Sequence, residues 1–164
     1  MSDTVPAFVH RVRVYYEDTD TAGVVYYANY LKFAERGRTE ALRSIGIDQR
    51  AFAASAGVQF VVRRVEADFR VPARLDDELE VVTRTVDIGG ASLTMEQTIR
   101  REGETLVAMR VEICSVTAGG PRAGRPVRMP REVAERLGGS AERGGGVGPT
   151  MATISPQISK TKRA

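Results

Sequence analysis

The sequence contains only one cysteine and one histidine, and this scarcity narrows the chemistry open to it. The single cysteine, Cys114, excludes an internal disulfide, and the single histidine, His10, excludes a clustered zinc site. A Ser-His-Asp triad would have to use His10. Cys114 has no activating neighbour along the chain, so we interpret it as a structural residue.

Long apolar runs are also absent. No segment approaches the roughly 20 consecutive apolar residues that cross a bilayer. The N-terminus lacks the basic region and the apolar stretch of a secretion signal. We therefore expect a cytoplasmic protein.

Net charge is missing from the part of the chain that is expected to fold. The sequence has 24 basic and 21 acidic residues. Residues 138–164 hold Arg143, Lys160, Lys162, Arg163 and Glu142, which leaves 20 of each sign in residues 1–137. This balance disfavours a nucleic-acid partner. The Gly/Ser-rich composition of residues 138–164 predicts a disordered basic tail after one folded domain at 1–137.

Residues 17–33 are the most informative segment. Asp18 and Asp20 end an alternating, strand-like run, and beyond Gly23 the apolar period changes from about 2 to about 3.6 residues. The chain therefore turns from strand to helix at the acids. The first N–H groups of a helix have no intrahelical acceptor and can stabilise an oxyanion. A carboxylate beside such groups predicts a reaction centre.

Apolar spacing predicts three helices. A long helix of about five turns is expected from Tyr27 to Ile45, with Gly46 as its C-terminal cap. Asp48 is expected to cap a short helix that ends at Gly57, and a final helix should run from Pro130 to Leu137. The charged residues of the long helix indicate a solvated face; they are Glu35, Arg36, Arg38, Glu40 and Arg43.

Four strands are predicted between residues 58 and 117. Hairpin signals at Gly89-Gly90 and Glu102-Gly103 imply an antiparallel sheet. In the first of these strands, Phe60 and Val62 have opposite parity to a second apolar set, Val65, Ala67, Phe69 and Val71. A β-bulge near Arg63-Arg64 would keep both sets on the core side. One antiparallel sheet with one apolar helix against it predicts a two-layer α+β domain.

Two further kinds of site begin with a D-x-D pair, a calcium loop and an aspartyl-nucleophile phosphatase. A calcium loop starting at Asp18 would need an oxygen ligand at Ala22 and an acid at Asn29, so it fails at both positions. An aspartyl-nucleophile phosphatase would use Asp18 and Asp20, with Asp76-Asp77 holding magnesium. That chemistry requires a buried parallel strand, whereas the first strand is half-exposed and the later strands form hairpins.

Several segments carry a resemblance to a known family. They are residues 16–31 (YEDTDTAGVVYYANYL), 33–36 (FAER), 38–40 (RTE), 60–64 (FVVRR) and 72–77 (PARLDD). Together they closely resemble the 4-hydroxybenzoyl-CoA thioesterase branch of the hotdog superfamily. Within it, the chain is most similar to the YbgC-type acyl-CoA thioesterases associated with the Tol-Pal system. The resemblance spans roughly residues 8 to 137.

This resemblance implies a fold and an activity. It implies an antiparallel sheet wrapped around one long central helix, and hydrolysis of acyl-CoA to the free acid and coenzyme A, which is part of the substrate, without a further cofactor or metal. It also implies a homodimer or homotetramer with the acyl site between subunits, and acyl carrier protein as a possible partner. A non-enzymatic alternative is a hotdog dimer that binds acyl chains or serves in assembly.

The same resemblance assigns the reacting groups. The second aspartate of the pair matches Asp20 as the catalytic carboxylate, acting as general base or as nucleophile. The backbone N–H seven residues later, which is that of Tyr27, matches the oxyanion donor. Asp18 is expected to cap the turn through its own carboxylate.

Substrate contacts are predicted on both sides of the reacting groups. Those in the turn and the acyl pocket are Gly23, Val24, Tyr26, Asn29 and Tyr30. Arginines bind phosphates well, so Arg63 and Arg64 are expected to contact coenzyme A. Further arginine candidates are Arg70, Arg74, Arg122, Arg125 and Arg128.

Overall fold

The computed structural model describes residues 7–138. The elements in chain order are β1 (Phe8–Arg13), η1 (Tyr16–Asp18), α1 (Asn29–Ser44), α2 (Gln49–Ala56), β2 (Val58–Phe69), β3 (Glu78–Gly89), β4 (Ser92–Arg101), β5 (Glu104–Thr117), η2 (Gly120–Arg122) and α3 (Arg131–Gly138). The predicted tail, apart from Gly138, lies outside the described residues. None of the described helices is long and apolar enough to cross a membrane.

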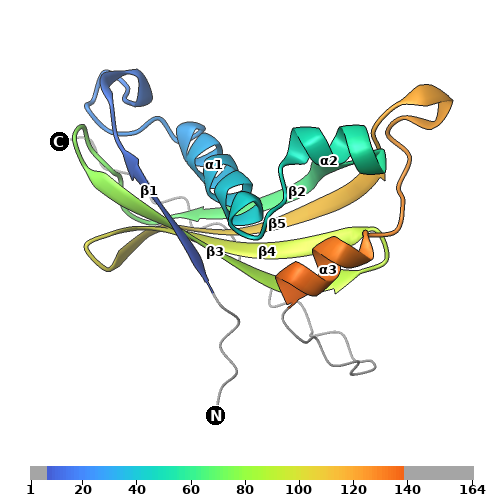
Figure 1. The fold of residues 1–164 in the computed structure, drawn as a ribbon. Helices are drawn as coiled ribbons and strands as arrows, with labels where there is room; N and C mark the ends of the chain where they lie inside the picture. The colour runs from blue at the N-terminus through green and yellow to red at the C-terminus, as the bar shows by residue number, and fades with distance from the viewer. Residues whose placement is uncertain (1–6, 139–164) are drawn as a thin grey trace, which may run out of the picture.

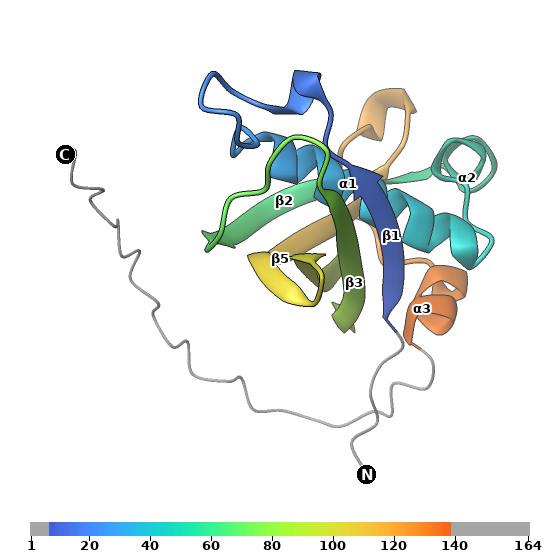
Figure 2. The ribbon, with the colours of Figure 1, turned by 90° about the vertical axis from the view of Figure 1, so that its left-hand side faces the viewer.

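All five strands form one antiparallel sheet in the order β1-β3-β4-β5-β2. The sheet curls, and α1 lies against its concave face (Figures 1 and 2). Buried apolar residues from α1 and from β1, β3, β4 and β5 form a single core, which includes Phe33, Leu79, Val81, Met95 and Val111. The predicted two-layer α+β domain is therefore confirmed.

The helix approaches the sheet most closely at Gly37. A Cβ atom at this position would lie 2.6 Å from Cγ1 of Val81, so only glycine fits without a shift. The close approach brings Arg38 within reach of the buried Gln97, whose Oε1 accepts a hydrogen bond from Arg38 Nη1 at 2.9 Å. Arg38 is thus partly buried, and its predicted place on a solvated face is wrong.

The predicted helix ends are close to the observed ones. α1 begins at Asn29, two residues after the expected start at Tyr27, and Gly46 follows its end with a positive φ of 82°. The short helix is as predicted. Asp48 caps α2 by accepting a hydrogen bond from the Ala51 N–H, and Gly57 ends it in the left-handed conformation.

The predicted bulge in β2 is confirmed by a register shift between Val62 and Arg64. On either side of it, Val62 and Val65 are opposite Ile113 and Val111 of β5, which are both buried on the concave face. The bulge therefore keeps the apolar residues of β2 on one side. At the start of the strand, Phe60 packs against the core as predicted. Further along, the apolar side chains of β2 stay partly exposed, because α1 packs on β1, β3 and β4. Val62 and Phe69 are each 47% exposed.

Candidate active site

The two aspartates of the D-x-D pair have different environments. Asp18 is 7% exposed, and its Oδ2 accepts a hydrogen bond from the Tyr15 N–H at 2.8 Å, so its carboxylate holds the η1 turn. Asp20 is exposed, and its Oδ1 accepts a hydrogen bond from the Ala22 N–H at 2.8 Å. Among residues 7–138, no hydrogen bond involves Oδ2 of Asp20. The Asp20 carboxylate therefore keeps one oxygen directed to solvent.

Backbone hydrogen bonds close the turn around Asp20. The Asp20 N–H donates to the Val24 carbonyl at 2.9 Å, and the Gly23 N–H donates to the Asp20 carbonyl at 3.0 Å. Gly23 has a φ of 75°, a conformation that residues with a side chain rarely adopt. Gly23 thus allows the chain to reverse next to the carboxylate. We call residues 14–28 the acid loop.

The acid loop is fastened to the start of α1 by Asn29. The Asn29 side chain is 7% exposed, and its Nδ2 donates to the Asp18 carbonyl at 2.8 Å. The Tyr26 N–H donates to the same carbonyl at 3.0 Å. The Asn29 amide nitrogen therefore bonds within the protein and fixes where the helix begins relative to the acids. The predicted contact of Asn29 with the acyl group stays a prediction.

The N–H of Tyr27 lies in the turn that leads into α1. Within the described residues it takes part in no hydrogen bond, whereas the carbonyl of Tyr27 accepts from the Tyr30 N–H. A free backbone N–H just before the first helical turn can donate to an incoming carbonyl oxygen. This is the property expected of an oxyanion donor.

An aromatic cluster surrounds this N–H. The ring of Tyr27 lies 4.8 Å from that of Tyr26 and 6.1 Å from that of Phe69, at the end of β2. A side-chain hydrogen bond shared with Tyr27 raises the pKa of the Tyr26 phenol. Tyr30 is buried, and its hydroxyl accepts from the Ala73 N–H at 2.9 Å, so it ties the helix to the loop after β2. Burial raises the pKa of Tyr30.

The loop before β3 supports the acid loop from behind. The Val25 N–H donates to the Ala73 carbonyl at 2.8 Å, and Val24 forms an isolated bridge with Arg74. Asp77 Oδ2 accepts from the Arg74 N–H at 2.8 Å and from Arg101 Nη1 at 2.7 Å. Burial would raise the pKa of Asp77, but these two donors outweigh it and lower the pKa.

These contacts overturn the phosphatase alternative. Asp77 is paired with Arg101, and β1 has an antiparallel neighbour instead of two parallel ones. In addition, no group of three or more metal-binding side chains occurs in the part of the chain that the structure describes.

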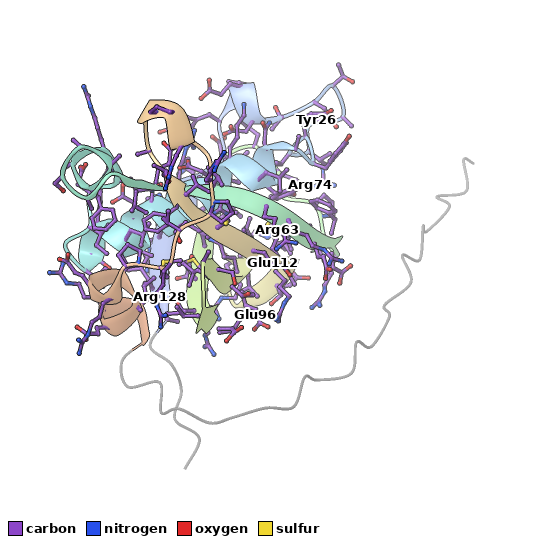
Figure 3. The ribbon with its side chains drawn as sticks, turned by 90° about the vertical axis from the view of Figure 1, so that its right-hand side faces the viewer. Tyr26, Arg63, Arg74, Glu96, Glu112 and Arg128 are labelled. Atoms are coloured by element: carbon purple, nitrogen blue, oxygen red, sulfur yellow. The ribbon has the colours of Figure 1, made fainter. Side chains whose placement is uncertain are left out.

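Of the predicted arginines, Arg74 lies beside the acid loop, where it forms the bridge with Val24. Arg64 forms an ion pair with Glu66 at 2.6 Å, and Arg70 forms one with Asp68 at 2.7 Å. Arg63 occupies the bulge of β2. Figure 3 shows Tyr26 and Arg74 near the arrowhead of β2 and Arg63 further back along the strand.

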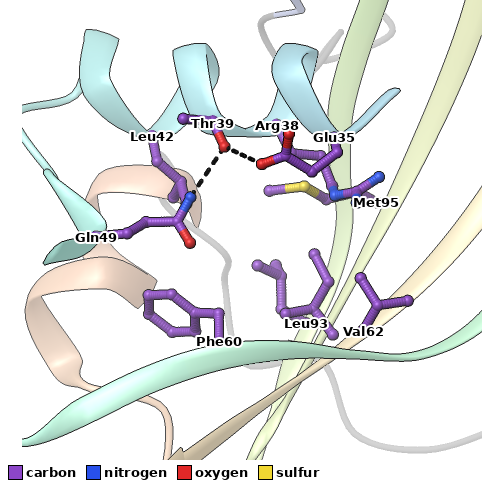
Figure 4. A pocket seen from close by; sticks show the side chains of 10 residues that line it. Glu35, Arg38, Thr39, Leu42, Gln49, Phe60, Val62, Leu93 and Met95 are labelled. Carbon is purple, nitrogen blue, oxygen red and sulfur yellow. Dashed lines mark hydrogen bonds between the residues drawn. The ribbon is translucent and has the colours of Figure 1, made fainter. Parts of the chain in front are cut away.

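A cavity that the sequence did not reveal lies at the other end of α1. It holds about 120 Å³ and opens beside Phe60 and Val62, near the start of β2. Its walls combine apolar side chains from the sheet with polar ones from α1 and α2 (Figure 4). Gln49 donates to the Thr39 hydroxyl, and that hydroxyl donates to Glu35. The only signals for it in the sequence were Glu35 of the FAER segment and Arg38 of the RTE segment, and their charge indicated a solvated face.

The amino-acid sequence matches a known family. Residues 22–108, which are more than half of the 164, match the family described as the Thioesterase superfamily. The chain belongs to this family. It is 41% identical to the acyl-CoA thioesterase YbgC of Haemophilus influenzae over 77% of this chain and 90% of that protein. It is 49% identical to the acyl-CoA thioester hydrolase YbgC of Escherichia coli over 58% of this chain and 71% of that protein.

Solved structures of thioesterases have the same fold. A probable thioesterase from Bartonella henselae superposes with a TM-score of 0.71, at 40% identity over 76% of this chain and all of that one. A 4-hydroxybenzoyl CoA thioesterase superposes with a TM-score of 0.75 over 80% of this chain and 98% of that one, and at 18% identity it supports the fold alone. The resemblance to hotdog thioesterases and the predicted hotdog fold are thus confirmed.

Proposed function

We propose that this thioesterase hydrolyses acyl-CoA, with Asp20 and the N–H of Tyr27 as its reacting groups. The observation that carries the activity is the match to acyl-CoA thioesterases over nine-tenths of a relative's length. The observation that supports these residues is the free N–H of Tyr27 in the same short segment as a carboxylate with an open oxygen.

The reaction requires two actions from the protein. The thioester carbonyl accepts a hydrogen bond from the Tyr27 N–H, which stabilises the charge that develops on its oxygen, an effect worth about 10²- to 10³-fold in rate. Asp20 then either takes a proton from an attacking water or attacks the carbonyl carbon itself, forming an anhydride that water cleaves. In both routes the C–S bond breaks, coenzyme A leaves as the thiol, and the acid is released.

A single chain leaves this site open on one side, and we propose that a second copy closes it. β2 is a long edge strand with apolar side chains on its concave side, and such edges pair with other strands. β1, the other edge, is short, and its Arg11 and Arg13 form ion pairs with β3. Two copies can share one continuous sheet with both concave faces on the same side of that sheet. The two-fold axis of the dimer is then perpendicular to the sheet, and β2 pairs antiparallel with β2 of the second copy.

This pairing would complete the acyl site. Tyr27 contacts Phe69 at the end of β2, whereas the cavity opens beside Phe60 and Val62 near its start. Antiparallel pairing brings the end of one β2 next to the start of the other. The cavity of one copy would therefore face the acid loop of its partner and receive the acyl group. An apolar cavity of about 150 Å³ holds benzene, so a cavity of about 120 Å³ favours a short acyl chain or a single small ring.

A role beside the Tol-Pal system and acyl carrier protein as a second donor of acyl groups rest on the resemblance to YbgC-type proteins alone. The cytoplasmic location rests on the sequence, which has no long apolar run and no secretion signal. A dimer of dimers is also compatible with the proposed pairing. A protein that only binds acyl chains is the competing function, since binding does not need the Asp20 carboxylate.

The test is hydrolysis of short, long and aromatic acyl-CoA by the wild type and by Asp20→Asn. We expect turnover of short acyl-CoA, and a fall in kcat of at least about 10²-fold in the variant. Tyr27→Phe should retain most activity, and Tyr27→Pro should lose it, because proline has no N–H. Normal turnover by Asp20→Asn would remove Asp20 from the mechanism, and a wild type that binds acyl-CoA without turnover would favour the competing function.

A further inference from the structure

Positive charge is concentrated at one end of this neutral domain. Residues 49–65 and residues 113–131 contain no aspartate or glutamate, and together they carry seven arginines. These two segments are neighbours in the sheet, because residues 58–62 of β2 pair with residues 113–117 of β5. The arginines are Arg50, Arg63, Arg64, Arg122, Arg125, Arg128 and Arg131. Sequence totals do not show this polarity.

Two of these arginines, Arg122 and Arg125, lie on a hydrogen-bonded hairpin, which we call the basic hairpin and define as residues 116–127. Val116 forms a bridge with Pro126, the Thr117 N–H donates to the Arg125 carbonyl at 2.9 Å, and the Gly124 N–H donates to the Thr117 carbonyl at 2.9 Å. Only backbone atoms of Arg125 make these bonds. Arg122 and Arg125 are exposed, and neither forms an ion pair within the described residues.

The acid loop has the opposite character and lies at the opposite end of β2. Residues 14–28 carry Glu17, Asp18 and Asp20 and no lysine or arginine. In Figure 3, Tyr26 of this loop lies near the arrowhead of β2, and the pale orange basic hairpin lies near the start of the strand. Ala118 at the base of the hairpin donates its N–H to the Gly57 carbonyl, directly before β2.

Antiparallel pairing of β2 with its copy therefore places the acid loop of one subunit beside the basic hairpin of the other. Opposite charges then meet at each end of the interface, which favours this arrangement over one that brings like ends together. Each acid loop would have arginines from its partner near the mouth of the site.

We propose that Arg122 and Arg125 of the partner subunit's basic hairpin bind the phosphates of the coenzyme A part of the substrate. This inference rests on the proposed thioesterase function and on the proposed pairing. Guanidinium groups form paired hydrogen bonds with phosphate oxygens, and within the described part of their own chain neither of these two is held in an ion pair. Phosphate binding far from the scissile bond acts equally on substrate and transition state, so it lowers KM without changing kcat.

The first experiment compares butanoyl-CoA with the N-acetylcysteamine thioester of butanoate, which has the same acyl group and no phosphate. The Arg122→Ser/Arg125→Ser variant should raise KM for butanoyl-CoA by at least about 10-fold, with kcat and all kinetics of the short thioester unchanged. The control Arg84→Ser/Arg110→Ser removes two charges from the outer face of the sheet and should change neither. An equal effect on both thioesters, or none on butanoyl-CoA, would contradict phosphate binding.

The second experiment tests whether the arginines act across the subunits. Asp20→Asn chains are mixed and re-associated with Arg122→Ser/Arg125→Ser chains. In a mixed dimer, one site combines the intact Asp20 of the second chain with the intact hairpin of the first, so activity with the wild-type KM should reappear. If the arginines served the Asp20 of their own chain, every active site in the mixture would keep the raised KM, and the proposal would be wrong.

Calorimetric binding of coenzyme A separates this inference from the proposed activity. The arginine variant should bind coenzyme A at least about 10-fold more weakly than the wild type. A wild type that hydrolyses neither thioester would refute the proposed activity, while the binding result would still decide the role of the hairpin. Equal binding by the wild type and the arginine variant would refute the inference whatever the turnover.

Discussion

Replacement of Asn29 by alanine should damage catalysis more than stability. The change removes a buried amide that donates to the Asp18 carbonyl at 2.8 Å and leaves that carbonyl with the Tyr26 N–H as its donor. Loss of one hydrogen bond and a small cavity together cost about 1–3 kcal/mol. For a chain of this size, about 2 kcal/mol corresponds to a fall in Tm of about 4–8 °C.

The expected effect of Asn29→Ala on kcat follows from the position of Asn29 between the helix and the acid loop. Asn29 joins the start of α1 to the residue two places before Asp20, so it fixes the Tyr27 N–H relative to the carboxylate. A displacement of about 1 Å can cost about 10²-fold in rate. We therefore expect kcat of Asn29→Ala to fall about 10- to 100-fold, with a smaller change in KM.

The assay needs a control of equal stability loss. Val133→Ala shortens a fully buried side chain in α3, far from the acid loop, and should lower Tm by a similar amount. Both variants are assayed with butanoyl-CoA well below either Tm. If Asn29→Ala and Val133→Ala kept the same kcat, the hydrogen bond to Asp18 would serve folding alone and the positioning argument would be refuted.

Three further changes test the fold around the site. Gly37→Ala should destabilise the protein by about 1–3 kcal/mol in urea unfolding, because its Cβ would clash with the sheet, whereas Gly89→Ala, which has open space, should cost less. Arg101→Gln should lower Tm above about pH 4. Because folding lowers the pKa of Asp77, the difference in Tm from the wild type should vanish as the pH falls through that pKa. A Tm difference that stayed constant with pH would contradict the ion pair. Val65→Glu should yield an inactive monomer in sedimentation, since it places a charge on the proposed interface; an active monomer would refute the composite site.

Local signals in the sequence were enough to predict most of the elements. The bulge followed from a change of parity between Val62 and Val65, and the cap of α2 followed from Asp48. Such features depend on residues that are close along the chain. The same is true of the acid loop, because a carboxylate, a glycine and a helix start lie within a few residues of one another.

The features that escaped prediction depend on contacts between distant segments. Arg38 is partly buried because Gly37 lets the helix approach the sheet closely, and its partner Gln97 lies 59 residues away along the chain. The hydrogen bond from the Asn29 side chain to the Asp18 carbonyl joins residues that are 11 positions apart, and the local pattern did not predict it. The basic end of the molecule exists only because residues 58–62 pair with residues 113–117, which brings two acid-free segments together.

The bulge at Arg63 connects these observations. Without the extra residue, every side chain after it would change faces, so that Glu66 and Asp68 would point to the concave side and Phe69 would leave Tyr27. With it, apolar residues run along one face of β2 from the cavity beside Val62 to the aromatic cluster at the acid loop. Antiparallel pairing needs such a face along the whole strand, because each half of β2 must pack against the other half of its copy. The bulge thus lets one strand border both the cavity at its start and the aromatic cluster around Tyr27 at its end.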